Sequence, residues 1–273
     1  MAAMNAAEQQ PGLPAPIDDP AEIRRQCRAG EFSGLTAGQA PGRVQANLMI
    51  VPRAVAYDFA VFCQRNPKPC PLLDITDPGD PEPRAIAPGD DIRSDLPRYR
   101  VFRHGVLVDE PADVRDIWRD DLVGFLIGCS YSFEEALSEA GLPLRHLEQG
   151  TNVAMYRTDR DCAPAGGFEG PMVVSMRPMT PEQAARAVEV TRPYVRAHGA
   201  PVHVGDPAAL GIADLDAPDY GDAVTVKPGE VPVFWACGVT PQAAVLNAKP
   251  EIAISHAPGH MFVSDLASES LLD

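Results

Sequence analysis

Two stretches of the sequence place small and hydroxyl residues where an apolar strand gives way to a helix. FLIGCSYSFEEAL (125–137) and VFWACGVTPQAAV (233–245) each contain an apolar strand, a cysteine, a small residue and a spacer. Ser132 or Thr240 then stands at the predicted N-cap, where a helix exposes unpaired N–H groups that attract anions. If both corners face one crevice, they form a receptor for two anionic groups, with Ser130, Ser132 and Thr240 as donors. Ordinary helix caps are the alternative interpretation.

The cysteine of each corner could do nucleophilic chemistry. A helix N-terminus lowers the pKa of a nearby thiol from about 8.5, in some proteins by several units. Cys129 or Cys237 would then be a thiolate that works with a histidine base. A cysteine that ends an apolar strand is also commonly a small packed residue. Cys237 is therefore a candidate catalytic residue, with packing as the competing interpretation.

A histidine and an aspartate further along are candidates for acid–base chemistry. In PVHVG (201–205), His203 alternates with two valines, so its side chain faces the other side of the predicted strand. Asp206 follows in Gly-Asp-Pro. A histidine with a carboxylate can act as a general base or hold a cation, which makes His203 and Asp206 our first candidates for catalysis. Aspartates in such loops also commonly bond their own backbone in turns.

Two arginines are candidates for binding a substrate carboxylate. Arg157 lies in NVAMYRT, and Arg177 lies near the end of MVVSMRP. A guanidinium group matches a carboxylate with two parallel hydrogen bonds, although surface and structural roles are common for arginine.

Several familiar motifs are missing from the sequence. It contains no phosphate loop, dinucleotide fingerprint, HExxH or GxSxG, which removes the usual ATP, NAD, zinc-protease and hydrolase interpretations. His256 and His260 have the spacing of metal ligands on a helix, but the intervening Pro258-Gly259 argues against a helix there. We therefore predict no cofactor and no metal.

Composition limits the partners and the compartment. The 273 residues carry 23 Lys and Arg against 38 Asp and Glu, a formal net charge of -15, without the basic cluster that a nucleic-acid partner needs. No run approaches the roughly 20 apolar residues of a membrane span, and the N-terminus does not resemble a secretory signal. Six scattered cysteines fit a reduced protein. We expect a cytoplasmic protein with a small acidic substrate, and the sequence allows a homo-oligomer.

The elements that must position these residues alternate between helix and strand. Residues 1–17 are rich in Ala, Pro and Gln and are predicted to be a disordered tail, followed by a single domain over 18–273. The predicted helices run from Pro20 to Gly30, over 54–64, over 112–119, and from a capping box at Thr180 to a stop near Pro193. The predicted strands are a hairpin over 99–108, a buried strand over 122–128, a strand over 172–176 and a short strand over 201–205. The proline-rich segment 66–84 is predicted to be an irregular loop. This alternation predicts an α/β fold, or a closely interleaved α+β fold.

Taken together, these segments resemble the D-glutamate cyclase family, a largely bacterial group that carries a hydro-lyase label. The matching stretches are VQANLMIVP, DFAVFCQRNPKPCPLL, GFLIGCSYSFEEAL, NVAMYRT, GPMVVSMRP, HGAPVHVGDP, PDYGD, EVPVFWACGVTPQ and HAPGHMFVSD, which span nearly everything from about residue 20 onward. The resemblance implies a compact mixed-sheet α/β protein in two lobes. It also implies dehydration of a small acidic amino acid, as in the conversion of D-glutamate to 5-oxo-D-proline and water by a longer mitochondrial relative.

The candidate residues suit such a cyclisation, and two other functions stay open. The two corners, with Arg157 or Arg177, would hold two carboxylates, and His203 or Asp206 would take the proton from the substrate ammonium. A cysteine-dependent amidohydrolase that uses Cys129 or Cys237 is the first alternative. A non-catalytic dicarboxylate-binding protein is the second.

Overall fold

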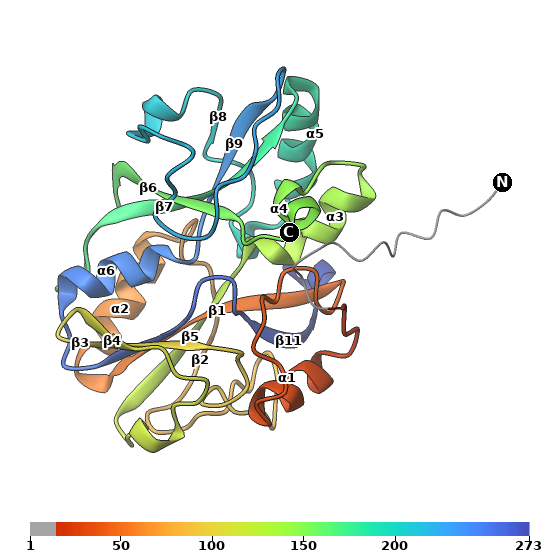
Figure 1. Cartoon of the computed structure of the whole chain (residues 1–273). Helices are drawn as coiled ribbons and strands as arrows, with labels where there is room; N and C mark the ends of the chain where they lie inside the picture. The colour runs from red at the N-terminus through yellow and green to blue at the C-terminus, as the bar shows by residue number, and fades with distance from the viewer. Residues whose placement is uncertain (1–14, 273) are drawn as a thin grey trace.

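Two sheets and six α-helices make up the fold of the residues that the structure describes. The computed structural model describes residues 15–272 (Figure 1), so most of the predicted tail lies outside the described residues. The α-helices are α1 (Pro20–Arg28), α2 (Arg53–Arg65), α3 (Glu134–Glu139), α4 (Arg145–Gln149), α5 (Pro181–Thr191) and α6 (Thr240–Ala248). The 3-10 helices are η1 (Arg115–Ile117), η2 (Ser130–Phe133), η3 (Val195–Ala197), η4 (Pro207–Leu210) and η5 (Ser268–Leu271).

The larger sheet is built around a long buried strand. Its strands are β1 (Arg43–Pro52), β2 (Leu72–Ile75), β3 (Tyr99–Arg103), β4 (Val106–Asp109), β5 (Leu122–Gly128), β10 (Ala253–His256) and β11 (Phe262–Ala267). They follow the order β2-β5-β1-β10-β3-β4, and β11 also pairs with β1. All residues of β5 are buried, as its apolar sequence predicts for a strand inside a sheet.

The smaller sheet has the order β6-β7-β9-β8. Its strands are β6 (Ala154–Asp161), β7 (Pro171–Met179), β8 (His203–Val204) and β9 (Val231–Ala236). The predicted α/β class is confirmed. Every named pair in both sheets is antiparallel, so neither sheet of the described chain mixes parallel with antiparallel pairs.

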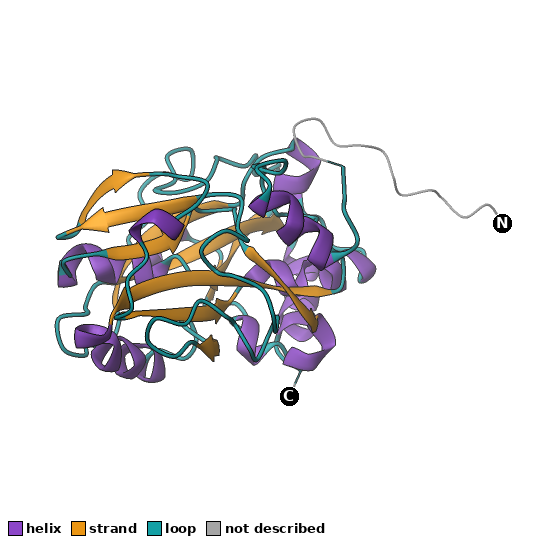
Figure 2. Ribbon diagram, turned by 90° about the horizontal axis from the view of Figure 1, so that it is seen from below, coloured by secondary structure: helices purple, strands orange, loops and turns teal. Residues whose placement is uncertain are grey.

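The two sheets share their apolar cores. One cluster joins Leu48 and Leu126 of the larger sheet to Val233 and Trp235 of the smaller one. In Figure 1 the smaller sheet lies above the larger, and α2 and α6 lie on the same side of the molecule. A second cluster contains Phe59 and Val245 from these two helices. Figure 2 shows helices on both sides of the strands.

Local sequence signals explain several element ends. The Asp19 side chain caps α1, and Thr180 with Gln183 forms the predicted capping box of α5. Helix α5 ends at Thr191, two residues before Pro193, as the missing N–H of proline requires.

Two predicted elements differ from the structure. The segment 66–84 contains strand β2, because Leu72–Ile75 pairs with β5 despite its proline-rich surroundings. The helix predicted over 112–119 is reduced to the three residues of η1. At β2, pairing with β5 overrides the local propensity.

Candidate functional site

The two strand-to-helix corners meet at a buried asparagine. Asn47 of β1 donates from Nδ2 to the carbonyl oxygens of Gly128 (2.8 Å) and Ile127 (3.3 Å), which end the first corner's strand. A Cβ on Gly238 of the second corner would lie 2.0 Å from the same Nδ2. Glycine follows Cys237 because a side chain there would overlap the Asn47 amide.

The hydroxyls of Ser132 and Thr240 bond backbone groups of neighbouring segments and cap no helix. Ser132 lies inside η2, where its Oγ accepts from the Gln45 backbone N–H (3.1 Å) and donates to the Gln45 carbonyl (3.3 Å). Thr240 Oγ1 accepts from the Val173 N–H (3.0 Å) and donates to the Cys237 carbonyl (2.7 Å). The predicted N-caps are therefore wrong: Cys129 precedes η2, Val239 precedes α6, and both hydroxyls are used between elements.

Both corner thiols are held in the neutral form. Cys129 and Cys237 belong to one buried cluster, and the Cys237 Sγ lies 3.6 Å from the Met155 Sδ. Burial raises the pKa of the Cys237 thiol to about 11 and raises that of Cys129 well above its usual value. The direction is opposite to the lowered pKa that the helix-start argument predicts. Packing is therefore the interpretation that the structure favours for these cysteines.

A buried ion pair lies directly behind the first corner. Glu134 Oε1 accepts from Arg177 Nε (3.0 Å) and also from Arg177 Nη2, and it lies 3.1 Å from His146 Nε2. Arg177 also donates from Nη2 to Ser130 Oγ (3.1 Å) and from Nη1 to Ser175 Oγ (3.2 Å). The guanidinium carbon lies 5.6 Å from the ring centre of Phe133 and 5.4 Å from that of Trp235.

This arrangement gives Arg177 a different role from the predicted one. Arg177 is fully buried, and each of its three guanidinium nitrogens donates to a protein acceptor. It therefore acts inside the protein, on Glu134 and Ser130, where a substrate carboxylate has no direct access.

The ion pair fixes Glu134 as an anion. Burial of the carboxyl group is the largest single influence and favours the neutral acid. Attraction from the nearby His146 and Arg177, together with the hydrogen bonds that Arg177 donates, outweighs it and lowers the pKa of Glu134 to about 2. The adjacent Glu135 behaves in the opposite way. Burial, with repulsion from Glu139 and Glu269, raises the pKa of Glu135 above its ordinary value.

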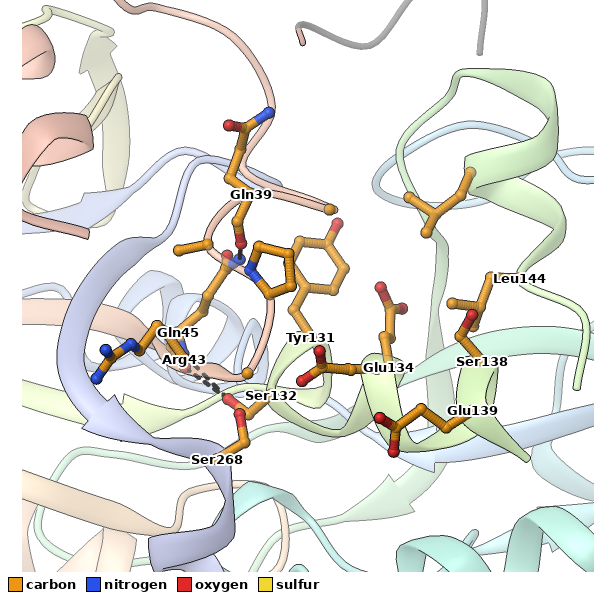
Figure 3. Close-up of a pocket in the computed structure, with 16 residues that line it drawn as sticks. Gln39, Arg43, Gln45, Tyr131, Ser132, Glu134, Ser138, Glu139, Leu144 and Ser268 are labelled. Atoms are coloured by element: carbon orange, nitrogen blue, oxygen red, sulfur yellow. Dashed lines mark hydrogen bonds between the residues drawn. The ribbon is translucent and has the colours of Figure 1, made fainter. Parts of the chain in front are cut away.

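A cavity of about 340 Å³ opens beside these residues (Figure 3). This volume lies at the small end of the range for ligand pockets, about 300–1,000 Å³. The cavity is lined by residues 38–43, Gln45, Tyr131, Ser132, Glu134, Glu135, Ser138, Glu139, Leu144, Leu147 and Ser268. Three buried lining atoms have no hydrogen-bond partner within residues 15–272: Gln45 Oε1, Glu134 Oε2 and Ser268 Oγ. Buried polar atoms are normally paired, so these three mark a place for a ligand or water.

Tyr131, which lines the cavity, connects it to two loops. Its hydroxyl donates to Asn152 Oδ1 (2.7 Å), and Asn152 Nδ2 donates to the Pro258 carbonyl (3.1 Å). The Tyr131 ring stacks on His146 with ring centres 6.2 Å apart. The cavity wall is thus tied to the loop before β6 and to the loop between β10 and β11.

The other predicted catalytic residues lie elsewhere. His203 opposes Phe234 across β8 and β9 and stacks on its ring, whereas Arg177 opposes Val233. Neighbouring positions on β9 face opposite ways, so His203 lies on the other face of the smaller sheet from Arg177. His203 Nε2 contacts the Asp206 carbonyl oxygen (2.8 Å), and the Asp206 carboxylate accepts from the Ala208 N–H (3.0 Å) in a turn.

Of the predicted substrate-binding residues, the structure brings together Ser130, Ser132 and Arg177. The Arg157 side chain is exposed on β6, and its backbone N–H donates to Asp219 (2.8 Å). Thr240, the first residue of α6, is buried against β7.

Sequence reasoning missed Glu134, Glu135 and His146, although it named Arg177. Glu134 could not be told from Glu135 in the sequence, since both follow the predicted cap. His146 lies in α4 without a motif around it. Gln45, a polar residue in an otherwise apolar run, was the available signal for the cavity wall.

Residues 15–272 contain no group of three or more His, Cys, Asp or Glu side chains placed to hold a metal ion. No helix within the same range has the length and apolar character needed to cross a membrane.

Comparison with known proteins gives the family. The model of the D-glutamate cyclase family matches residues 123–265, which include both corners and Arg177. A protein of Stutzerimonas stutzeri named "Putative hydro-lyase" is 62% identical over 92% of this chain and 95% of its own length. A hydro-lyase-named protein of Bordetella petrii is 60% identical over 91% and 94%, and one of Bacillus subtilis is 55% identical over 92% and 98%. The chain belongs to the D-glutamate cyclase family.

Proposed function

We propose that the chain is a hydro-lyase that cyclises a small acidic amino acid, D-glutamate to 5-oxo-D-proline and water, in the cavity beside Glu134 and Glu135. One observation carries the assignment of the site. Two adjacent carboxyl groups line the same cavity, and their surroundings shift their pKa values in opposite directions. Such a pair is the usual mark of one permanent anion beside one group that exchanges protons.

The reaction balances without ATP or a redox partner. The substrate nitrogen forms a bond to the γ-carboxyl carbon, and one carbon–oxygen bond breaks. The two protons that the ammonium group gives up leave with that oxygen as water. The site must therefore take a proton from nitrogen, give one to oxygen and hold the substrate chain folded back.

We assign the proton transfer to Glu135. Its raised pKa makes the neutral acid more accessible than for an ordinary glutamate, so it can protonate the leaving oxygen and accept a proton from nitrogen. Arg43 lies at the edge of the cavity, with its guanidinium group turned away from Glu134 (Figure 3). Its Nη1 donates to the Asp265 carbonyl oxygen (2.8 Å), and no carboxylate of residues 15–272 forms an ion pair with it. We propose that the positive charge of Arg43 attracts a substrate carboxylate to the edge of the cavity.

The reduced cysteines support a cytoplasmic setting for this activity. All six are free and buried. Chains that work in oxidising compartments commonly carry disulfides, so we propose that this enzyme acts in the cytoplasm.

The test follows water loss directly. Purified protein is incubated with D-glutamate, L-glutamate and other acidic amino acids, and the cyclised products are measured by chiral mass spectrometry. We expect turnover of D-glutamate, with E135Q reducing kcat by about 10²- to 10⁴-fold. E189Q, which changes an exposed glutamate of α5, is the control. Absence of water loss from every acid in the panel would exclude the proposed reaction.

A further inference from the structure

The two oxygens of the Glu134 carboxylate differ in their hydrogen bonds. An arginine facing a carboxylate commonly bonds both oxygens in parallel. Here both guanidinium contacts from Arg177 go to Oε1, and His146 Nε2 lies 3.1 Å from that same oxygen. Oε2 has no donor among residues 15–272, although the residue is only 4% exposed. A buried anionic oxygen without a donor costs free energy, so Oε2 is a strong acceptor left without a partner in a residue that lines the cavity.

A second acceptor lines the same cavity. Gln45 is 3% exposed, and its Nε2 donates to the carbonyl oxygens of Thr36 (2.8 Å) and Gln39 (3.1 Å). Only the nitrogen end of the amide can satisfy two carbonyl oxygens, so the orientation of the amide is fixed. The Ser132 hydroxyl holds the Gln45 backbone from both its N–H and its carbonyl. Gln45 Oε1 is then held as an acceptor without a donor in the described chain.

We infer that Glu134 Oε2 and Gln45 Oε1 form an ammonium-binding site, which makes this cavity specific for acids that carry an amino group. The inference rests on the proposed function and names the part of the substrate that these residues recognise. A protonated amine brings three N–H donors and one positive charge, which match an anionic oxygen and a neutral amide oxygen. Figure 3 shows the side chains of Gln45 and Glu134 around the one cavity.

The site distinguishes amino acids from their amine-free counterparts. A dicarboxylate without an amine, such as glutarate, leaves both acceptors without donors and lacks the positive charge that would offset Glu134, Glu135 and Glu139. A hydroxy acid supplies one neutral donor. A site built to bond an N–H rejects analogues that lack it much more strongly than a hydrophobic pocket rejects a missing methylene.

The experiment compares binding across this series by isothermal titration calorimetry. The ligands are D-glutamate, L-glutamate and D-aspartate, each beside its amine-free acid, with ammonium chloride against potassium chloride as a test for a simple cation. We expect the amine to improve binding by at least about 10-fold in the wild type, the range of a charged hydrogen bond. E134Q should lose most of this preference. Q45M, which keeps the ion pair with Arg177, should lose part of it.

Matched controls separate this inference from the proposed reaction. E135Q should retain the preference for amines while it loses turnover, and circular dichroism checks that each variant is folded. If E134Q does not fold, Q45M alone decides, because it removes one acceptor of the pair. Binding without water loss would overturn the cyclase proposal and leave the ammonium site standing. The ammonium site would be overturned if amino acids and amine-free acids bound equally well, or if none of the amino acids bound. It would also be overturned if folded E134Q and Q45M kept the wild-type preference for amines.

Discussion

At the scale of single residues, the site depends on one arginine that has no access to solvent. Arg177 is surrounded by Glu134, Ser130, Ser175 and two aromatic rings, so its charge is compensated entirely by protein groups. A buried ion pair adds little net stability compared with apolar residues of the same size, but breaking it leaves one charge without a partner. The pair is therefore better understood as a device that positions the Glu134 carboxylate.

This role predicts a large loss of stability when only one partner is removed. R177M should lower the free energy of unfolding by about 3–5 kcal/mol, because Glu134 would stay buried with little compensation. The double variant R177M/E134L should recover much of that loss. Urea unfolding of the wild type, both single variants and the double variant gives the coupling energy.

A control tests the residue-scale reasoning. E22Q changes an exposed ion pair with Arg25 on α1 and should move the free energy of unfolding by less than about 1 kcal/mol. If R177M is as mild as E22Q, or if the double variant loses the sum of both single effects, Arg177 does not hold Glu134 in the way described.

At the scale of elements, the position of the site depends on the close contact between the end of β5 and η3. A Cβ on Gly128 would lie 1.8 Å from the backbone oxygen of Arg196 in η3. Gly128 is not among the residues with positive φ, so close approach explains the glycine and backbone conformation does not. Cys129, Ser130 and Ser132 follow it immediately, so their placement depends on this contact.

G128A is therefore expected to destabilise the fold through overlap with backbone atoms that cannot rotate away. We expect a loss of about 1–3 kcal/mol or more, together with reduced turnover, because the corner carries the cavity wall. G167A is the matched control, since its nearest neighbour would lie 3.7 Å away, at ordinary contact distance. Thermal unfolding and D-glutamate turnover measure both effects. Equal stability of the two variants would contradict a tight junction.

The same elements explain how far the sequence could predict this protein. The α5 capping box and the fully apolar β5 follow from local patterns, and the structure confirms both. Ser132 and Thr240 carried an equally good local signal, but their hydroxyls bond Gln45 and Val173, which are distant in the chain. Local pattern cannot show such partners. For the same reason, the sequence could not single out Glu134, whose role depends on Arg177, 43 residues away.

At the scale of the whole molecule, buried histidines occupy places where distant segments come together. His198 Nδ1 lies 2.8 Å from the Lys68 carbonyl oxygen. His256 Nδ1 lies 3.2 Å from both the backbone nitrogen and the carbonyl oxygen of Leu48. Burial, which disfavours the charged ring, lowers the pKa of each from 6.5 to about 4. The folded state therefore holds both rings neutral where the unfolded chain would protonate them.

This difference sets the direction of the pH dependence. The pKa is lower in the folded state, so below pH 6.5 the unfolded chain binds more protons and the free energy of unfolding falls. The stabilising contribution is complete above about pH 6.5 and is lost as the pH falls towards 4. Each histidine contributes a slope of up to about 1.4 kcal/mol per pH unit within that window. Loss of the Glu134 contribution follows at lower pH, between 4.5 and about 2.

Urea unfolding at a series of pH values between 4 and 8 measures this slope for the wild type, H198Q and H256Q. Each variant should be less stable at pH 7 and should show a slope reduced by about one proton between pH 6.5 and 4. H104Q changes a histidine in the exposed turn after β3 and controls for the loss of a histidine as such. A stability that stays constant from pH 8 to 4, or wild-type slopes in both H198Q and H256Q, would show that the buried rings do not couple folding to pH. A slope that disappears in only one variant would assign the dependence to that junction, between Lys68 and His198 or between Leu48 and His256.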